Sequence, residues 1–159
     1  MISIRKGRMD DLGQVHYLIK ELAIYEKQPD AVETTVESML EDGFGENPAF
    51  GFYVAENNEQ KIAGLALYYI RYSTWKGKLL YLEDLIVSEK YRKAGIGRKL
   101  MDAIFRETID QKCRGIQWQV LDWNKPAIEF YNKYNPWNDP EWINCRMSLQ
   151  QIEDYLSTS

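Results

Sequence analysis

The chain has 159 residues, a common size for one domain built around one hydrophobic core. Hydrophobic residues make up 45% of it, and no linker, repeat or low-complexity run divides it, so we expect a single domain over residues 1–159. The formal net charge of -4 argues against a nucleic-acid partner, which would require a basic surface, and it is compatible with a cationic ligand.

The sequence carries no sign of a membrane or of an oxidising compartment. The first residues, 1–6, contain no apolar run long enough for a signal peptide, and no segment approaches the length of a membrane span. The two cysteines, Cys113 and Cys145, lack metal-ligand spacing, so we expect no metal site and no disulfide. Free thiols are typical of a reducing compartment, and the sequence therefore predicts a cytoplasmic protein without a membrane contact.

The first half of the chain predicts a strand, two helices and a hairpin. Alternating apolar residues predict a strand at 2–6, and apolar residues at helical spacing predict a helix that opens at 9–11 and ends near 25–26. A short helix at 35–40, closed by turn residues at 42–45, comes next. Strands at 50–56 and 61–72, joined by the Asn-rich residues 57–60, then form the predicted hairpin.

The second half continues with alternating strands and helices. A continuously apolar strand at 79–87 is expected inside the sheet, followed by a helix at 96–112 and a strand at 116–121. Asn124 caps the next helix, 124–134, which Asn135 can end in a left-handed conformation. A last strand at 142–149 and a helix at 150–156 complete an α+β (α/β-like) fold, in which helices flank a mixed central sheet.

The segment from Tyr81 to Leu100 predicts a phosphate site, because a strand, a basic glycine-bearing turn and a helix follow one another. Glycines allow close approach of a ligand, and the first turn of a helix offers free N–H groups at its positive end. A P-loop is excluded because Lys99 precedes Leu100 rather than Ser or Thr, and Leu100 also replaces the third glycine of a dinucleotide site. The pyrophosphate of coenzyme A is the remaining ligand.

Several motifs then resemble one family. Arg-x-x-Gly-x-Gly at 92–97 and the run 120–131 resemble the two acyl-CoA motifs of the GNAT acetyltransferase superfamily. Residues 18–26, 41–48, 72–77 and 81–84 resemble the diamine (spermidine/spermine) acetyltransferases, and 72–77 and 121–124 lean toward the thialysine N-epsilon-acetyltransferase branch. The resemblance implies a single GNAT-type domain and a homodimer. It also implies acetyl-CoA-dependent N-acetylation of a small amine: thialysine or a lysine-like amine, a diamine or a polyamine.

The resemblance also implies roles for individual residues. Glu83 corresponds to the base that takes a proton from the amine, and Tyr131 to the acid that protonates the departing thiolate, with Tyr134 as an internal rival. The implied cofactor-binding residues are Leu85, Ile86, Val87, Arg92, Lys93, Ala94, Gly95, Ile96, Gly97, Asn124, Lys125, Pro126 and Ala127. The implied substrate-binding residues are Tyr25, Glu26, Glu83, Asp84, Gln117, Trp118 and Gln119.

Further expectations concern neighbours of these residues. If the strand is regular, Asp84 lies on the opposite side of the sheet from Glu83. His16 is expected at the surface without a catalytic role. Trp75 is expected to wall the amine pocket or to pack at a dimer interface. Cys113 has no partner base in the sequence, which favours direct transfer in a ternary complex over a Cys nucleophile.

Two other functions fit the same scaffold. One is acetylation of protein N-termini or protein lysines, which needs an open groove for a peptide. The other is a CoA-binding regulatory module without catalysis, although the presence of both Glu83 and Tyr131 gives no indication that the site has degenerated.

Overall fold

The computed structural model describes residues 1–158, which fall into two compact units: Met1–Gln119, and the residues from Val120 onward. Within residues 1–158, none of the helices combines the length and the apolar character that crossing a membrane requires.

The first unit is built on a five-stranded sheet with the strand order β1-β2-β3-β4-β5. The first four strands pair antiparallel, whereas β5 pairs parallel with β4, so the predicted mixed sheet is confirmed. The α+β fold class is confirmed as well. The strands are β1 (Ile2–Lys6), β2 (Gly51–Asn57), β3 (Ile62–Ser73), β4 (Gly77–Val87) and β5 (Ile116–Gln117).

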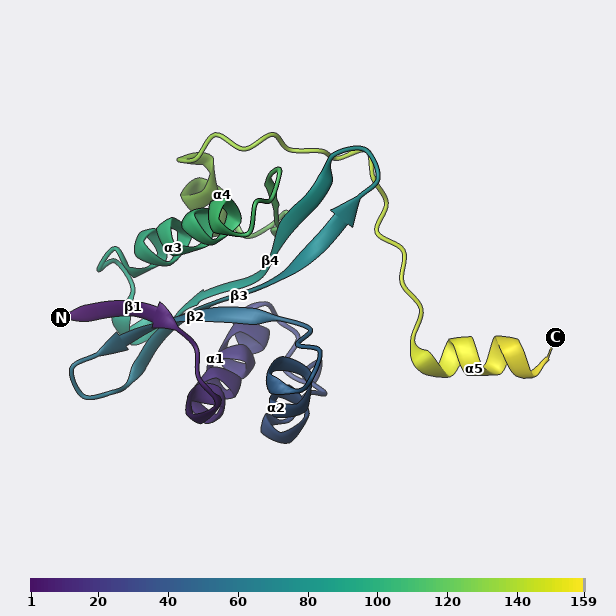
Figure 1. Cartoon of the computed structure of the whole chain (residues 1–159), viewed down its shortest axis with the longest axis horizontal. Coiled ribbons are helices and arrows are strands. Elements are labelled where there is room, and N and C mark those ends of the chain that lie inside the picture. The colour runs from purple at the N-terminus through teal and green to yellow at the C-terminus, as the bar shows by residue number, and fades with distance from the viewer. Residues whose placement is uncertain (159) are drawn as a thin grey trace. The chain divides into compact units, whose positions relative to one another are not determined.

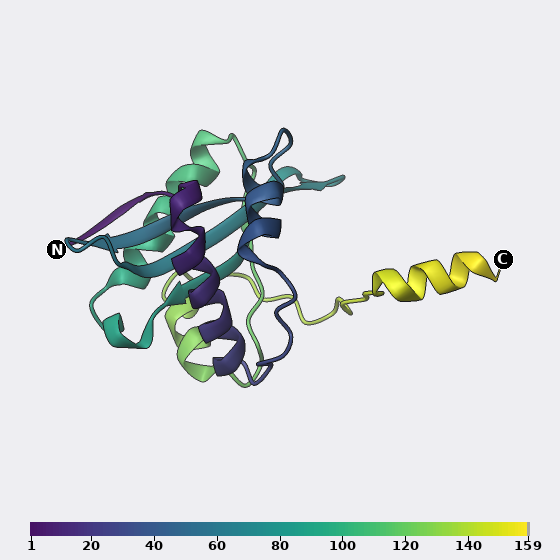
Figure 2. The same cartoon turned by 90° about the horizontal axis from the view of Figure 1, so that it is seen from below.

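Helices cover both faces of this sheet (Figure 1). A 3-10 turn at Met9–Asp11 leads into α1 (Leu12–Tyr25), which packs on one face together with α2 (Val36–Phe44) (Figure 2). The opposite face is covered by α3 (Ile96–Asp110). The core between α1, α2 and the sheet contains Leu12, Val15, Leu18, Met39, Phe52, Val54, Ile62, Leu65, Leu67 and Ile86.

A buried carboxylate anchors α3 to the sheet. Glu107 is only 2% exposed, and its oxygens accept hydrogen bonds from the hydroxyls of Tyr53 at 2.6 Å and Tyr68 at 2.8 Å. Gln111 donates a further hydrogen bond at 2.8 Å, and the ammonium of Lys6 lies 3.6 Å away. Because a buried charge is costly unless it is paired and hydrogen-bonded, this set of donors is what allows Glu107 to remain ionised.

The second unit holds two helices, α4 (Lys125–Asn132) and α5 (Leu149–Ser157). The Asn124 side chain accepts a hydrogen bond from the N–H of Ala127 at 3.3 Å, which confirms the predicted cap of α4. Asn135 adopts the left-handed conformation, with φ 52°, as the sequence predicts for the turn after this helix.

Three predicted elements differ from the structure. The strand predicted at 142–149 is wrong: these residues form no ladder in the described part of the chain, and the side chains of Trp142 and Ile143 are exposed. The strand predicted at 116–121 shortens to the two residues of β5. The turn predicted at 42–45 is largely helical, because α2 runs to Phe44 before Gly45 ends it by donating to the carbonyl of Glu41. Alternating apolar residues favour a strand, but a strand also requires a hydrogen-bonded neighbour.

Candidate functional site

The predicted phosphate cradle lies between β4 and α3. The 3-10 turn Glu89–Tyr91 leads into the loop, and Gly95 then forms the N-cap of α3 with φ 73°, a conformation that favours glycine. No side chain caps this end of the helix, and the first intrahelical hydrogen bond runs from Lys99 to the carbonyl of Gly95 at 3.2 Å. The first-turn N–H groups therefore point out of the helix, as an anion site requires.

The basic residues of the cradle are exposed, whereas its apolar member is not. The side chains of Arg92, Lys93 and Arg98 are exposed, and Lys93 also has a positive φ of 67°. Ile96 is 2% exposed and packs into the core, so only its backbone can serve a ligand. The cradle thus offers backbone donors within a positively charged surface, which is the chemistry that a pyrophosphate needs.

Arg92 connects the cradle with the end of α1. Its Nε donates to the carbonyl of Val87 at 3.2 Å, and its guanidinium carbon lies 5.1 Å from the centre of the Tyr25 ring, within cation–π range. Two predicted sets of residues, cofactor-binding Arg92 and substrate-binding Tyr25, are therefore in contact.

The edge of β4 that faces β5 is mostly unpaired. The ladder between them covers only Leu80 with Ile116 and Tyr81 with Gln117, although β4 continues to Val87. On its other edge, Leu85, Ile86 and Val87 pair with Ala66, Leu65 and Gly64 of β3. Backbone groups of β4 beyond Tyr81 can consequently accept an extended ligand such as a pantetheine arm.

A β-bulge in β4 changes the expected relation between Glu83 and Asp84. Asp84 pairs with Leu67 and Leu82 pairs with Tyr68, which leaves Glu83 as an extra residue. Leu67 belongs to the core under α1, so its partner Asp84 faces α1. The expectation that Asp84 and Glu83 lie on opposite sides of the sheet required a regular strand, and β4 is irregular at this point.

Three acidic groups come together on the α1 face. Burial, followed by the charges of Glu83 and Glu26, raises the pKa of Asp84 to about 7. Burial also raises the pKa of Glu26, which follows the last residue of α1. The structure thus brings together three of the predicted substrate-binding residues in a cluster that repels a fourth negative charge and attracts a cation.

A pair of stacked tyrosines, which the sequence did not predict, lies beside this acidic cluster. Tyr69 and Tyr81 are paired across β3 and β4, with ring centres 5.1 Å apart. Burial raises the pKa of both phenols, the charge of Glu83 raises it further, and Arg71 opposes the shift. Arg71 donates to the Oε1 atom of Gln117 at 2.6 Å. Tyr-x-Arg at 69–71 was visible in the sequence, but the pairing of Tyr69 with Tyr81 depends on the register between β3 and β4, which the sequence did not predict.

In the second unit, the predicted cofactor-binding residues Asn124 to Ala127 lie at the start of α4. Asn124 is buried, and Pro126 lies within the first turn, where a missing N–H is tolerated. Tyr131 is partly buried, and the centre of its ring lies 5.3 Å from that of Phe130. Tyr134, two residues beyond the end of α4, contacts the same Phe130 ring, with ring centres 5.7 Å apart.

Two other sequence-based expectations concern His16 and the cysteines. His16 is only 8% exposed, and its Nε2 lies 2.6 Å from the carbonyl of Thr34, so the expectation of a surface histidine is wrong. The sequence placed it beside the apolar face of α1 but gave no sign of the loop that packs over it. Cys113, partly buried, and Cys145, exposed, are both free thiols in the structure.

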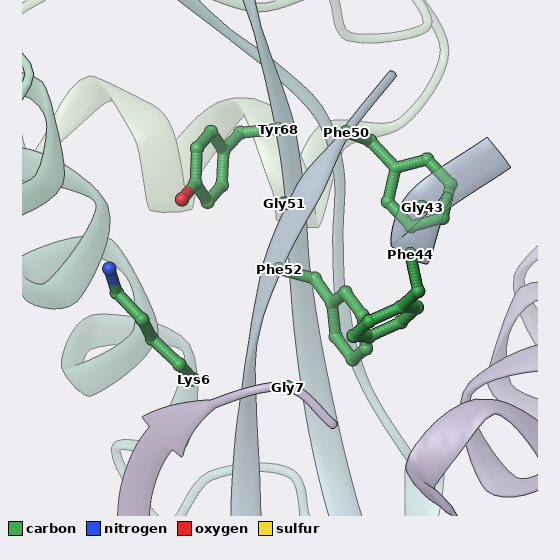
Figure 3. Close-up of a pocket in the computed structure, with 8 residues that line it drawn as sticks. All are labelled: Lys6, Gly7, Gly43, Phe44, Phe50, Gly51, Phe52 and Tyr68. Atoms are coloured by element: carbon green, nitrogen blue, oxygen red, sulfur yellow. The ribbon is translucent and has the colours of Figure 1, made fainter. Parts of the chain in front are cut away.

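A cavity of about 110 Å³ lies at the end of β1, among residues with no predicted role. Figure 3 shows Lys6 and Tyr68 on one side of β2 and the phenylalanine rings on the other. A Cβ atom on Gly7 would lie 1.9 Å from the Phe52 ring, so glycine is required for this packing. None of the predicted site residues lines this cavity, and we regard it as a feature of the core.

Comparison with known proteins yields one consistent result. The model of the acetyltransferase (GNAT) family matches residues 15–135. The chain is 41% identical over 137 residues to the thialysine N-epsilon-acetyltransferase of Bos taurus, with 82% of this chain and 81% of that protein covered.

Two solved structures share the fold. An integron cassette protein of Vibrio cholerae matches with a TM-score of 0.79 at 22% identity, covering 99% of this chain and 98% of its own. The aminoglycoside acetyltransferase AAC(6')-Iy, solved with a CoA-containing bisubstrate analogue, matches with a TM-score of 0.76 at 18% identity, covering 93% and 99%.

Proposed function

The chain belongs to the acetyltransferase (GNAT) family, and from this premise we propose that it transfers an acetyl group from acetyl-CoA to a primary amine of a small cationic substrate. Thialysine, lysine-like amines, diamines and polyamines are the candidate acceptors. The acidic cluster of Glu26, Glu83 and Asp84 carries this proposal, because Glu83 and Asp84 lie on β4, whose edge toward β5 is open beyond Tyr81.

We assign acetyl-CoA to the cradle and to the open edge of β4. The uncapped first turn of α3 and the exposed charges of Arg92 and Lys93 fit its pyrophosphate, and the backbone of Leu85 to Val87 fits its pantetheine arm. Bound acetyl-CoA supplies the acetyl group as an activated thioester. From the second unit we assign Asn124, Lys125, Pro126 and Ala127 to the neighbourhood of the thiol.

In the proposed mechanism, the acidic cluster prepares the amine. A lysine-like amine has a pKa of about 10.4, so only about one molecule in 2,500 is neutral at pH 7. Glu83 takes the proton, directly or through one water, and the neutral nitrogen then forms the C–N bond as the C–S bond breaks. Tyr131 donates a proton to the departing sulfur, and the second proton, which the new amide nitrogen loses, passes through water to restore the Tyr131 hydroxyl. Glu26, Asp84, Tyr25 and Gln117 to Gln119 bind the acceptor.

Release of CoA, measured over a panel of amines, tests this function. We expect turnover with at least one small primary amine, and a loss of about 10²- to 10⁴-fold in kcat for Glu83→Gln and Tyr131→Phe. The matched controls are Glu59→Gln in the β2–β3 turn and Tyr17→Phe on α1, both exposed, which should retain the activity. Full activity of Tyr131→Phe would refute the acid role, and would direct attention to Tyr134.

The alternative functions predict different outcomes in the same assay. A protein acetyltransferase would modify a lysine peptide faster than any free amine. A regulatory module would bind acetyl-CoA tightly and release no CoA. The acidic cluster favours a cationic acceptor over a regulatory module, because its three carboxyl groups concentrate negative charge at one point, and the assay distinguishes a free amine from a lysine peptide.

We further propose that both units form a single N-acetyltransferase domain and that the enzyme is a cytoplasmic homodimer. The match to the family model crosses the boundary between the two units, which supports one domain. The free thiols Cys113 and Cys145 support a reducing compartment. Exposed apolar side chains such as Trp137, Trp142 and Ile143 support a subunit contact, which sedimentation of the purified protein would test.

A further inference from the structure

Arg71 is a cation on the face of the sheet that carries the acidic cluster. Leu65 and Leu67 of β3 belong to the core under α1, and Arg71 follows Leu67 at an even spacing, so it faces the same side. Its contact with Gln117, the neighbour of Tyr81 in the β4–β5 ladder, agrees with this placement. An arginine on the same face as the acidic cluster requires an explanation, because its positive charge would repel the cation that the cluster attracts.

The stacked tyrosines separate the two kinds of charge. Along β3, the partner of Asp84 comes first, then Tyr69 with its partner Tyr81, and then Arg71. Glu83 and Arg71 shift the pKa of both phenols in opposite directions, which shows that both charges are near the rings. The face therefore presents a negative end, an aromatic middle and a positive end.

The length of this arrangement fits an amino acid with an amine at the end of its side chain. Leu67, opposite Asp84, and Arg71 are four residues apart on β3, or about 13 Å at about 3.3 Å per residue. The amine and the carboxylate of extended lysine are about 7 Å apart from standard bond lengths. The side chains at either end reach inward over the remaining distance, and the methylene chain covers the tyrosine rings.

We propose that Arg71 binds the α-carboxylate of the acceptor, so that the enzyme prefers lysine-like amino acids to diamines of the same chain length. This inference rests on the proposed function. A guanidinium has five N–H donors in a planar fork that matches a carboxylate, and the Gln117 contact uses one of them. Within residues 1–158, Arg71 makes no ion pair.

The same arginine disfavours the other candidate acceptors. A diamine with one ammonium in the acidic cluster would bring its second ammonium toward Arg71, where like charges repel. Arg71 consequently distinguishes two substrates that the acidic cluster alone treats alike, which makes it a specificity-determining residue rather than a participant in acetyl transfer.

Matched pairs of acceptors test this assignment. L-lysine with cadaverine, and L-ornithine with putrescine, differ within each pair only by the carboxylate. For Arg71→Gln we expect the ratio of kcat/KM, amino acid over diamine, to fall about 10- to 100-fold, the loss expected for one charge-assisted hydrogen-bonded pair. The fall should come from a higher KM for the amino acid, together with a lower KM for the diamine.

The control is Arg106→Gln, which removes an exposed arginine from α3 and should leave the ratio as in the wild type. Arg71→Lys keeps the charge but loses the planar fork, and should give an intermediate ratio. An unchanged ratio in Arg71→Gln, in a protein whose thermal unfolding matches the wild type, overturns the inference while the proposed function stands. No CoA release from any of the four amines with the wild type overturns the proposed function itself.

Discussion

Asp84 and Glu107 lie on opposite faces of one sheet, and their surroundings shift the pKa of the two carboxyl groups in opposite directions. Burial would raise the pKa of Glu107, but hydrogen bonds from Tyr53, Gln111 and Tyr68 outweigh it and hold the pKa below its usual value. For Asp84, burial and two neighbouring carboxylates act together, and its pKa rises to about 7. The carboxylate of Glu107 therefore has hydrogen-bond donors around it, whereas the carboxyl group of Asp84 has two negative charges as neighbours.

This difference separates a structural acid from an acid suited to a substrate. The charge of Glu107 is already compensated by the protein, so it fastens α3 to β2 and β3. Under the proposed function, the charge of Asp84 is compensated when a cationic amine binds, and relief of this repulsion contributes to the affinity for the amine.

Replacement of Glu107 by Ala should lower the free energy of unfolding by about 3–5 kcal/mol, because two buried phenols lose their acceptor and a cavity opens. Urea unfolding at pH 7 measures this change. The control is Arg106→Ala, at the exposed neighbouring position of α3, for which a change within about 0.5 kcal/mol is expected. A loss below about 1 kcal/mol for Glu107→Ala would show that the anchor is dispensable.

Replacement of Asp84 by Asn should have the opposite effect on stability. Because the pKa of Asp84 in the folded protein lies above its ordinary value, its contribution to stability is present at low pH and is lost as the pH rises through about 7. Asn does not ionise, so above pH 7 the variant should be more stable than the wild type, by at most about 4 kcal/mol. Unfolding curves at pH 4 and pH 8 measure this, and equal stability differences at both would contradict it.

The same variant should bind its acceptor less well. We expect kcat/KM for a cationic amine to fall about 10- to 100-fold, since one charge-assisted contact is lost. In the wild type, kcat/KM should rise with pH through about 7 as Asp84 ionises, and this limb should disappear in Asp84→Asn. The variant Asp30→Asn, in the exposed turn after α1, serves as the control.

The smallest effect is expected for Tyr53→Phe, which removes one donor to Glu107 and retains the ring. The free energy of unfolding should fall by about 1–2 kcal/mol, because the hydrogen bond of 2.6 Å ends on a charged group. Tyr17→Phe, an exposed tyrosine of α1, is the matched control in the same urea titration. A double variant with Glu107→Gln should show less than the sum of the two losses, and strict additivity would argue against a coupled cluster.

The sequence alone was sufficient for the cradle and for most of the fold. The strand, turn and helix order at 81–100 depends on neighbours in the chain, and so do the cap at Asn124 and the left-handed Asn135. Such local features follow from the preferences of the residues themselves. The strand predicted at 142–149 was wrong because pairing is not a local property, and the burial of His16 was missed for the same reason.

By itself, then, the sequence determined the strand, glycine-bearing turn and helix at 81–100, most of the other elements and the membership of the chain in an acetyltransferase family. Only the tertiary structure decided how charges are arranged on the face under α1. The bulge at Glu83, the raised pKa of Asp84 and the position of Arg71 beyond the stacked tyrosines depend on the register between strands and on helix packing. Register and burial arise from contacts between residues distant in the chain, and in the proposed function those contacts set the electrostatic energies that distinguish one amine from another.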